Sequence, residues 1–231
     1  MKDLNKQTPT LIEVVNLAIE SRLCELHTSL PAIVESYDSK TGLASVKPML
    51  KKRFVKDSAA VEMPIIQDVP VAFPRTQKSF VVLPVAKGDI GHLQFSERSL
   101  DIWKDLGGIQ DPKDIRKHNL SDGVFYLGGY PSKQHVEGYV AESIHIKNES
   151  SEVVMLKDGD LKLLNAIGQF NLTKDGKIKI AGATGEIIDL LVQIVAALKT
   201  HSHATAVGPS GPPDTTANLI QIETLLNGLK V

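Results

Sequence analysis

The amino-acid sequence predicts a mainly β protein, with an N-terminal helix, a five-stranded barrel, a short β stem and C-terminal helices. Three observations support this fold class. Between residues 30 and 130, short apolar runs are separated by turn residues. Between residues 140 and 182, apolar and polar residues alternate with a period of two, which places every second side chain on one face of a strand. Near both ends of the chain, apolar residues recur at helical spacing instead.

Residues 1–29 are predicted to contain an amphipathic helix from Thr10 to Leu26. Its apolar residues at helical spacing are Leu11, Val14, Val15, Ala18, Ile19 and Leu23. Thr8 or Thr10 can cap the start of the helix, and Glu13 completes a capping box with Thr10. We expect the apolar side to pack either on the next domain or on a neighbouring subunit.

Residues 30–131 are predicted to form the barrel. The strand candidates are the runs 30–37, 43–50, 69–74, 80–85, 87–95 and 123–127. Prolines at positions 64, 70, 74 and 84 fall at the ends or edges of these runs, because proline cannot donate to a central ladder. Short strands with no long helix between them favour a small five-stranded Greek-key barrel.

The pattern of short strands is interrupted between Ser96 and Leu120. One helical turn is expected at residues 99–103, capped by Ser96 or Ser99. The polar residues that follow have two interpretations. His118 with Asp114 and Asp122 could form an acid/base cluster, or the segment is a surface loop whose side chains cap its own turns. We favour the loop.

Residues 132–183, after a glycine- and proline-rich linker at 128–133, are predicted to form the stem. Its alternating runs are separated by tight turns at Lys157-Asp158-Gly159 and Lys174-Asp175-Gly176. A meander this small makes only half a core, so its apolar face needs a partner. That partner is either the same stretch of another copy or the rest of its own chain, as in an ordinary sandwich. Periodicity alone leaves both alternatives open.

Residues 184–231 are predicted to form two helices joined by a loop. Thr184 is expected to cap the first helix, whose apolar residues cover more than one stripe: Ile187, Ile188, Leu190, Leu191, Ile194, Val195 and Leu198. Such a helix suits burial by several neighbours, for example copies of itself round an axis. A loop rich in glycine and proline follows at 208–214, and the final helix is amphipathic.

Two histidines between these helices, His201 and His203, are the candidate metal ligands. In an extended segment both imidazoles point to one side, because residues i and i+2 share a face. One chain offers two nitrogens, which is too few for a closed zinc site. Three chains round an axis would offer an octahedral set of six, a geometry that favours iron or nickel. The alternative is a pair of solvent-exposed histidines.

Composition excludes several classes of function. A net charge of −1 and 5% aromatic residues argue against a nucleic-acid partner. The single cysteine, Cys24, excludes an intrachain disulfide framework. The start lacks the apolar core of a signal peptide, so we expect the chain to be made in the cytoplasm. No phosphate-binding loop or hydrolase motif is present, which predicts that the protein is not an enzyme.

A specific combination of segments spans most of residues 30–131. They are 69–74, 80–85, 87–91, 95–103, 116–122 and Tyr130-Pro131. Together they resemble the N-terminal domain of central-spike proteins of contractile-tailed bacteriophages, the membrane-piercing needles of the baseplate assembly protein V type. The resemblance implies an oligonucleotide/oligosaccharide-type (OB) barrel, an intertwined trimeric β stem and no catalytic residues.

The same resemblance implies partners and a location. The protein would be a homotrimer in the tail baseplate of the virion, made in the host cytoplasm, that caps the hub protein and pierces the host outer envelope on contraction. His201 and His203 would bind one iron ion per trimer on the three-fold axis. The sequence departs from the needle pattern because a helix precedes the histidines and residues 204–231 follow them. The C-terminal helix must therefore fold back, or the histidines do not lie at the tip.

Two other functions compete with the spike. A metal-dependent cell-wall hydrolase would need a carboxylate to activate metal-bound water, and Asp214 is the only acid close to the histidines in the sequence. A nucleic-acid-binding barrel is disfavoured by the neutral charge and scarce aromatic residues.

Overall fold

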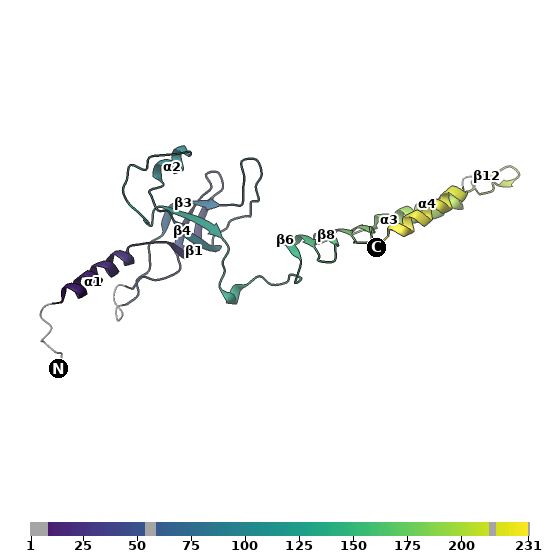
Figure 1. Ribbon diagram of the computed structural model, residues 1–231. Coiled ribbons are helices and arrows are strands. Elements are labelled where there is room, and N and C mark those ends of the chain that lie inside the picture. The colour runs from purple at the N-terminus through teal and green to yellow at the C-terminus, as the bar shows by residue number, and fades with distance from the viewer. Residues whose placement is uncertain (1–8, 54–58, 213–215, 231) are drawn as a thin grey trace. The chain divides into compact units, whose positions relative to one another are not determined.

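The computed structural model describes residues 9–53, 59–212 and 216–230. The chain forms two compact units, Met1–His135 and Val136–Val231, each of which is described by itself (Figure 1). The first holds the N-terminal helix and a closed five-stranded barrel, and the second holds an open sheet and two helices, so the predicted fold class is confirmed. In the described part of the chain, no helix has the length and apolar character needed to cross a membrane.

The first helix, α1, spans Leu11–Cys24 and begins with the predicted capping box. The Glu13 amide donates to Thr10 Oγ at 3.3 Å, and the Thr10 amide donates to a Glu13 carboxylate oxygen at 2.8 Å. Thr10 is therefore the cap, while Thr8 lies outside the described residues. No residue of α1 is buried, so its apolar side faces solvent.

The barrel closes in the strand order β1-β2-β3-β5-β4. Its strands are β1 Ser29–Asp38, β2 Leu43–Pro48, β3 Ile66–Ala72, β4 Ile90–Phe95 and β5 Gly123–Leu127. The pair β3 and β5 is parallel, and every other neighbouring pair is antiparallel. Side chains that alternate along the strands fill the interior with Ala32, Val34, Ala44, Val46, Ile66, Val69, Leu93, Phe95 and Phe125. All nine are buried by their own chain.

One expected strand of this unit is absent, and the expected helical turn has a different N-cap residue. Residues 80–85 form no strand, and only an isolated bridge joins Phe80 to Arg75. Pro74 and Pro84 cannot donate to a ladder, and the apolar side chains from Phe80 to Leu83 are exposed, whereas Val85 packs against the barrel core. The helical turn exists as α2, Asp101–Leu106, with Leu100 as its N-cap residue, and the Asp101 amide donates to Ser99 Oγ at 3.5 Å. The Leu100 amide at its start donates to the distant carboxylate of Asp122.

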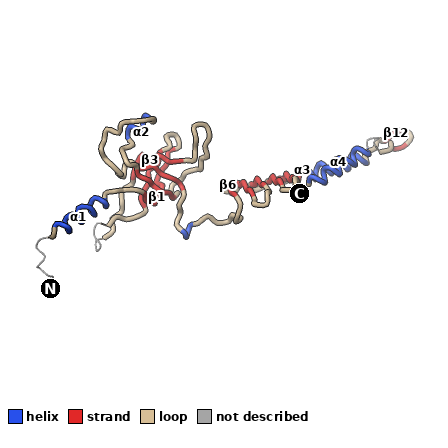
Figure 2. The backbone as a smooth tube through the Cα atoms, in the orientation of Figure 1, coloured by secondary structure: helices blue, strands red, loops and turns tan. Residues whose placement is uncertain are grey.

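The second unit begins with an antiparallel sheet, drawn in red between the labels β6 and α3 in Figure 2. Its six strands follow one another in sequence order. They are β6 Ile144–Asn148, β7 Ser151–Met155, β8 Leu161–Leu164, β9 Gln169–Leu172, β10 Ile178–Gly182 and β11 Gly185–Glu186. The predicted turns are present, with Gly159 at φ +101° and Gly176 at φ +79°. A short 3₁₀ helix, η1 Ser132–Gln134, precedes this unit within the predicted linker region.

Helices α3, Ile187–Lys199, and α4, Thr216–Leu229, pack against each other beyond the sheet. An ion pair of 2.5 Å joins Lys199 to Glu223, and a bridge between Lys230 and Ile178 brings the end of α4 back to β10. The C-terminal helix therefore folds back along α3. The two-residue strands β12, Ala204–Thr205, and β13, Gly208–Pro209, lie in the turn between the helices.

The predicted cap of α3 was also wrong. Glu186, not Thr184, is the N-cap residue. Its carboxylate accepts the Asp189 amide of the helix at 2.8 Å and the Ile180 amide of β10 at 3.1 Å. Glutamate is longer than the usual capping residues, and this length lets one side chain link the helix to the sheet.

Candidate functional site: an open apolar sheet face and a histidine pair

The central part of one face of the stem sheet is apolar, and the polar pair Asn148 and Ser151 lies beyond it at the end of the β6–β7 hairpin. The register places residues that face each other across the strands on the same side of the sheet. One cross-strand row is Ile144, Met155, Leu161, Leu172 and Ile178, and the other is Ile146, Val153, Leu163, Phe170 and Ile180. We call these ten residues the stem face. The alternation in sequence predicted this face, and the register shows that it continues across five strands.

The stem face is open. None of its ten side chains is buried, and six have exposed fractions between 36% and 61%. A contiguous apolar surface of this kind on a soluble protein marks an interaction site. The stem is therefore not a sandwich closed by its own second unit.

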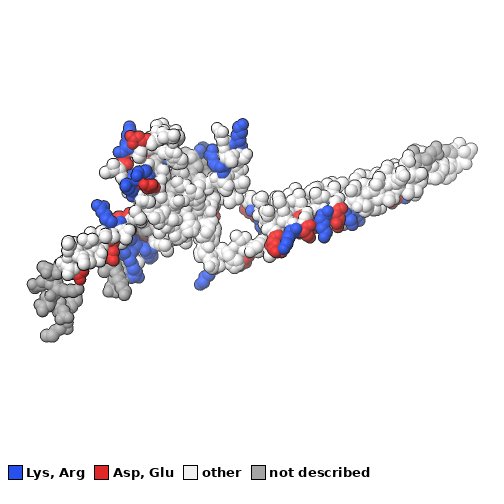
Figure 3. All heavy atoms as spheres, viewed as in Figure 1, with Lys and Arg blue, Asp and Glu red and all other residues white. Residues whose placement is uncertain are grey.

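The opposite face of the sheet is polar. Its central row runs through His145, Val154, Lys162, Asn171 and Lys179. His145 accepts the Val140 amide at Nε2 at 3.2 Å, so Nδ1 carries the proton that contacts Glu152. In the second unit, Figure 3 shows charged side chains gathered along one edge and uncharged surface over the rest of the visible side. The two faces thus differ in chemistry, because one carries a row of polar side chains around the buried Val154 and the other carries the ten apolar side chains of the stem face.

Helix α3 carries a second open apolar stripe. Ile188 and Val195 are buried in the second unit. The exposed apolar side chains on the helix are Ile187, Leu190, Leu191, Ile194 and Leu198. Their spacing of i, i+3, i+4, i+7 and i+11 places them on one side of the helix, as in the seam of a helical bundle.

The two predicted metal ligands lie together just after α3. The Nε2 atoms of His201 and His203 are 3.3 Å apart, and the two rings meet edge to face with centroids 4.6 Å apart. Both side chains are exposed. The prediction that these imidazoles point to one side agrees with this geometry.

The donor set fits part of a metal site. Two nitrogens 3.3 Å apart can both lie about 2.1 Å from one ion, the usual distance to an imidazole, with about 100° between them. Among the residues that the structure describes, no group of three or more His, Cys, Asp or Glu residues is placed to hold a metal. If the pair binds a metal, one protomer would supply two ligands and the others would have to come from outside it. Asp214, the acid invoked for a hydrolase, lies outside the described residues.

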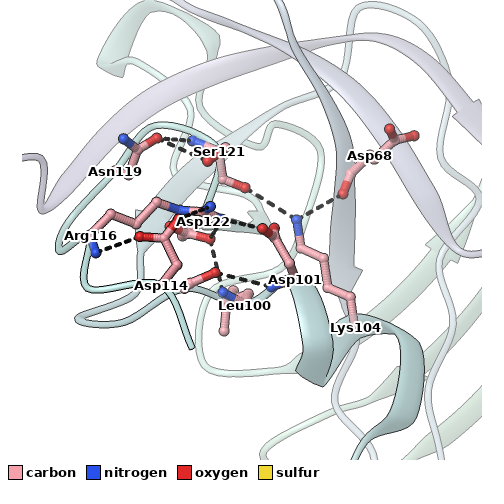
Figure 4. A network of polar contacts seen from close by, with 10 residues as sticks. Asp68, Leu100, Asp101, Lys104, Asp114, Arg116, Asn119, Ser121 and Asp122 are labelled. Atoms are coloured by element: carbon pink, nitrogen blue, oxygen red, sulfur yellow. Dashed lines mark hydrogen bonds and ion pairs between the residues drawn. The ribbon is translucent and has the colours of Figure 1, made fainter. Parts of the chain in front are cut away.

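A polar network in the barrel unit holds the connection between β4 and β5 (Figure 4). Arg116 donates to both carboxylate oxygens of Asp122 at 2.7 and 2.8 Å and also pairs with Asp101 and Asp114. Asp122 has an exposed fraction of 0%. The network joins both ends of the connection to helix α2.

Electrostatics in this network follow from its hydrogen bonds. Burial would raise the pKa of Asp122, but hydrogen bonds from Arg116 and the Leu100 amide outweigh burial and lower that pKa. The hydrogen bonds that Arg116 donates to Asp122 and Asp101 raise its pKa, so the guanidinium remains charged. The acid/base interpretation fails here, because Arg116 engages Asp114 and Asp122, and His118 Nδ1 is buried without a hydrogen-bond partner in the described structure.

Sequence reasoning missed Arg116 as the centre of this network. It stands among eight other charged or polar residues in the connector from Asp111 to Asp122, and no spacing rule links it to Asp101 or Leu100. The concentration of opposite charges in the connector is the one signal in the sequence that ion pairs could hold it.

The barrel unit is also the part of the chain that is similar to a known family. Residues 30–128 match the family model described as the phage protein Gp138 N-terminal domain. The search of curated proteins found no match to the chain. The matched region contains all five barrel strands and the Arg116 network, while the stem face and the histidine pair lie outside it. The barrel is therefore similar to the N-terminal domain of a phage protein, and the match favours a structural role in a phage particle.

Proposed function

We propose that this protein is the central spike of a contractile phage tail, a homotrimer that caps the hub of the baseplate and pierces the host outer envelope. The open stem face is the observation that carries this proposal. Ten apolar side chains in two rows require a cover, and copies of the same face can cover one another round a three-fold axis.

The order of parts along the chain supports the spike. A barrel similar to a phage protein domain comes first, then the open sheet, then the helical hairpin with the histidine pair at its turn. In a trimer the sheets would interlock into a shaft and the α3 stripes would meet at its axis. Penetration by force requires such a stiff shaft, and it requires no catalytic side chain.

The histidine pair supports three copies in particular. Two imidazoles from each of three chains make six ligands, the octahedral set that suits iron. The bound ion would supply a cross-link between the three hairpin turns. In this proposal His201 and His203 are the ligands, and the ion lies on the three-fold axis.

The mass of the full chain in solution tests the trimer. Light scattering at micromolar concentration is expected to give three times the mass of one chain, and a monomer would contradict the proposal. Quantitative mass spectrometry of tails purified from virions tests the location. It should find three copies per tail, and absence of the chain from tails would exclude the baseplate. The hydrolase alternative stays an untested prediction, with no contact among the described residues in its favour.

A further inference from the structure

The turn between α3 and α4 holds His203 by its backbone. The His203 amide donates to Ser210 Oγ at 2.8 Å, and the Ser210 amide donates back to the His203 carbonyl oxygen at 2.7 Å. Ser210 thus contacts His203 through both its side chain and its main chain. Between these residues, β12 and β13 pair through a short ladder whose turn lies at residues 206–207, and Gly208, with φ at +118°, begins β13.

The two histidines depend on different anchors. The His201 amide donates to the Leu198 carbonyl oxygen at 3.3 Å, so His201 is held by the last turn of α3. The Thr200 hydroxyl lies 3.3 Å from the Ala197 carbonyl oxygen and strengthens the same helix end. His203 lies beyond the helix, and the contacts described for its backbone are the two with Ser210.

We propose that Ser210 is a positioning residue for His203, which sets the separation of the two imidazoles at the metal-binding tip. This inference rests on the proposed function, because it assumes that the pair binds a metal. Loss of the Ser210 hydroxyl would free the His203 amide and let the backbone rotate, which moves the imidazole away from His201. Residues that orient metal ligands typically change metal affinity by about 10- to 100-fold when they are replaced.

An isosteric pair of variants tests the role of the hydroxyl in the full-length chain. Ser210→Thr keeps the acceptor oxygen, whereas Ser210→Val has the same shape without it. We expect Ser210→Val to bind Fe²⁺ about tenfold more weakly than the unaltered protein under anaerobic titration, and Ser210→Thr to bind normally. Ser202→Ala is the matched control, because Ser202 lies between the ligands and no contact of its side chain is described. The visible spectrum of bound Co²⁺ gives a second readout, since it reports ligand geometry.

The outcomes separate this inference from the proposed function. If the unaltered protein binds Fe²⁺ no better than a His201→Ala/His203→Ala variant, the metal tip is wrong and the role of Ser210 is overturned with it. If the unaltered protein binds Fe²⁺ and Ser210→Val matches Ser202→Ala, the metal tip stands and the positioning role is wrong. Oligomeric mass and thermal midpoint are measured for each variant, and a loss of affinity supports the inference where both are unchanged.

Discussion

The barrel and the stem are built from similar alternating strands, but they solve the burial of apolar side chains differently. In the barrel, five strands of one chain close on themselves, and the nine core residues are buried. In the stem, six strands follow in order without closing, and the stem face stays open. The comparison shows that alternation creates an apolar face, whereas closure decides whether the same chain can bury it. We infer that barrel stability belongs to the single chain and stem stability depends on association.

The largest expected effect comes from a charge on the stem face. Leu163→Asp would place three carboxylates in the apolar interior of the proposed trimer, where burial of unpaired charge is prohibitive. We expect complete loss of the trimer at micromolar concentration, measured as a monomer mass by light scattering. The barrel should still unfold cooperatively.

The neighbouring residue on the opposite face provides the control for that experiment. Lys162→Asp puts the same side chain on the polar row, so the trimer should persist. If both variants remain trimeric, the stem face is not the interface, and stem stability does not depend on association as we infer.

A barrel-core truncation should act through the single chain. Phe125 is buried in the core, and Phe125→Ala is expected to lower the free energy of barrel unfolding by about 3–5 kcal/mol. Urea denaturation at several protein concentrations should give the same decrease in the free energy of barrel unfolding each time. The adjacent, exposed Tyr126 serves as control through Tyr126→Ala, which should cost much less. If the urea midpoint of barrel unfolding rises with protein concentration, barrel stability depends on association, and the proposed difference between barrel and stem is wrong.

Disrupting the Arg116 network should lower the stability of the barrel less than the core truncation does, and the size of this effect should depend on pH. Arg116→Met leaves the buried Asp122 carboxylate without its cation, which is expected to cost about 3 kcal/mol at neutral pH. In the intact protein the pKa of Asp122 is lowered, so this carboxylate stabilises the fold above the ordinary aspartate pKa, and its contribution is lost as the pH falls through the lowered value. In Arg116→Met burial should raise that pKa, so acidification should relieve the defect.

Chemical denaturation between pH 7 and pH 3 measures this difference. The stability gap between Arg116→Met and the intact protein should narrow steadily towards acid. Arg98→Met removes an exposed pair with Glu97 and should change stability by less than about 1 kcal/mol. A gap that stays constant with pH would mean that Asp122 is not the group responsible.

The smallest expected effect concerns the joint between sheet and helix. Glu186→Gln weakens the cap of α3 and its link to β10, with an expected cost of about 0.5–1 kcal/mol to the second unit. Burial opposes ionisation of Glu186, but three backbone amides outweigh it and lower its pKa. Its contribution is therefore present above the ordinary glutamate pKa and fades as the pH falls through the lowered value. Thermal melts of Thr184→Ala, the cap that the sequence suggested, should match the unaltered protein.

The sequence by itself determined the local structure and which faces are apolar. The capping box at Thr10 and Glu13, the tight turns at Gly159 and Gly176, and the period-two stem were all readable, because each depends on residues within a few positions. The imidazole pair was also predicted, since His201 and His203 are two residues apart.

Only the tertiary structure decided the interactions between distant segments. Asp122 caps α2 from 22 residues away, Arg116 closes the connection, and Glu186 displaces Thr184 because β10 supplies a second amide. Residues 80–85 read as a strand but found no ladder partner. Each of these outcomes depends on which groups meet in space after the barrel closes or the helix turns back. Local propensity carries no information about contacts between segments that are distant in the sequence. The strand register was likewise needed to show that the ten side chains of the stem face lie together.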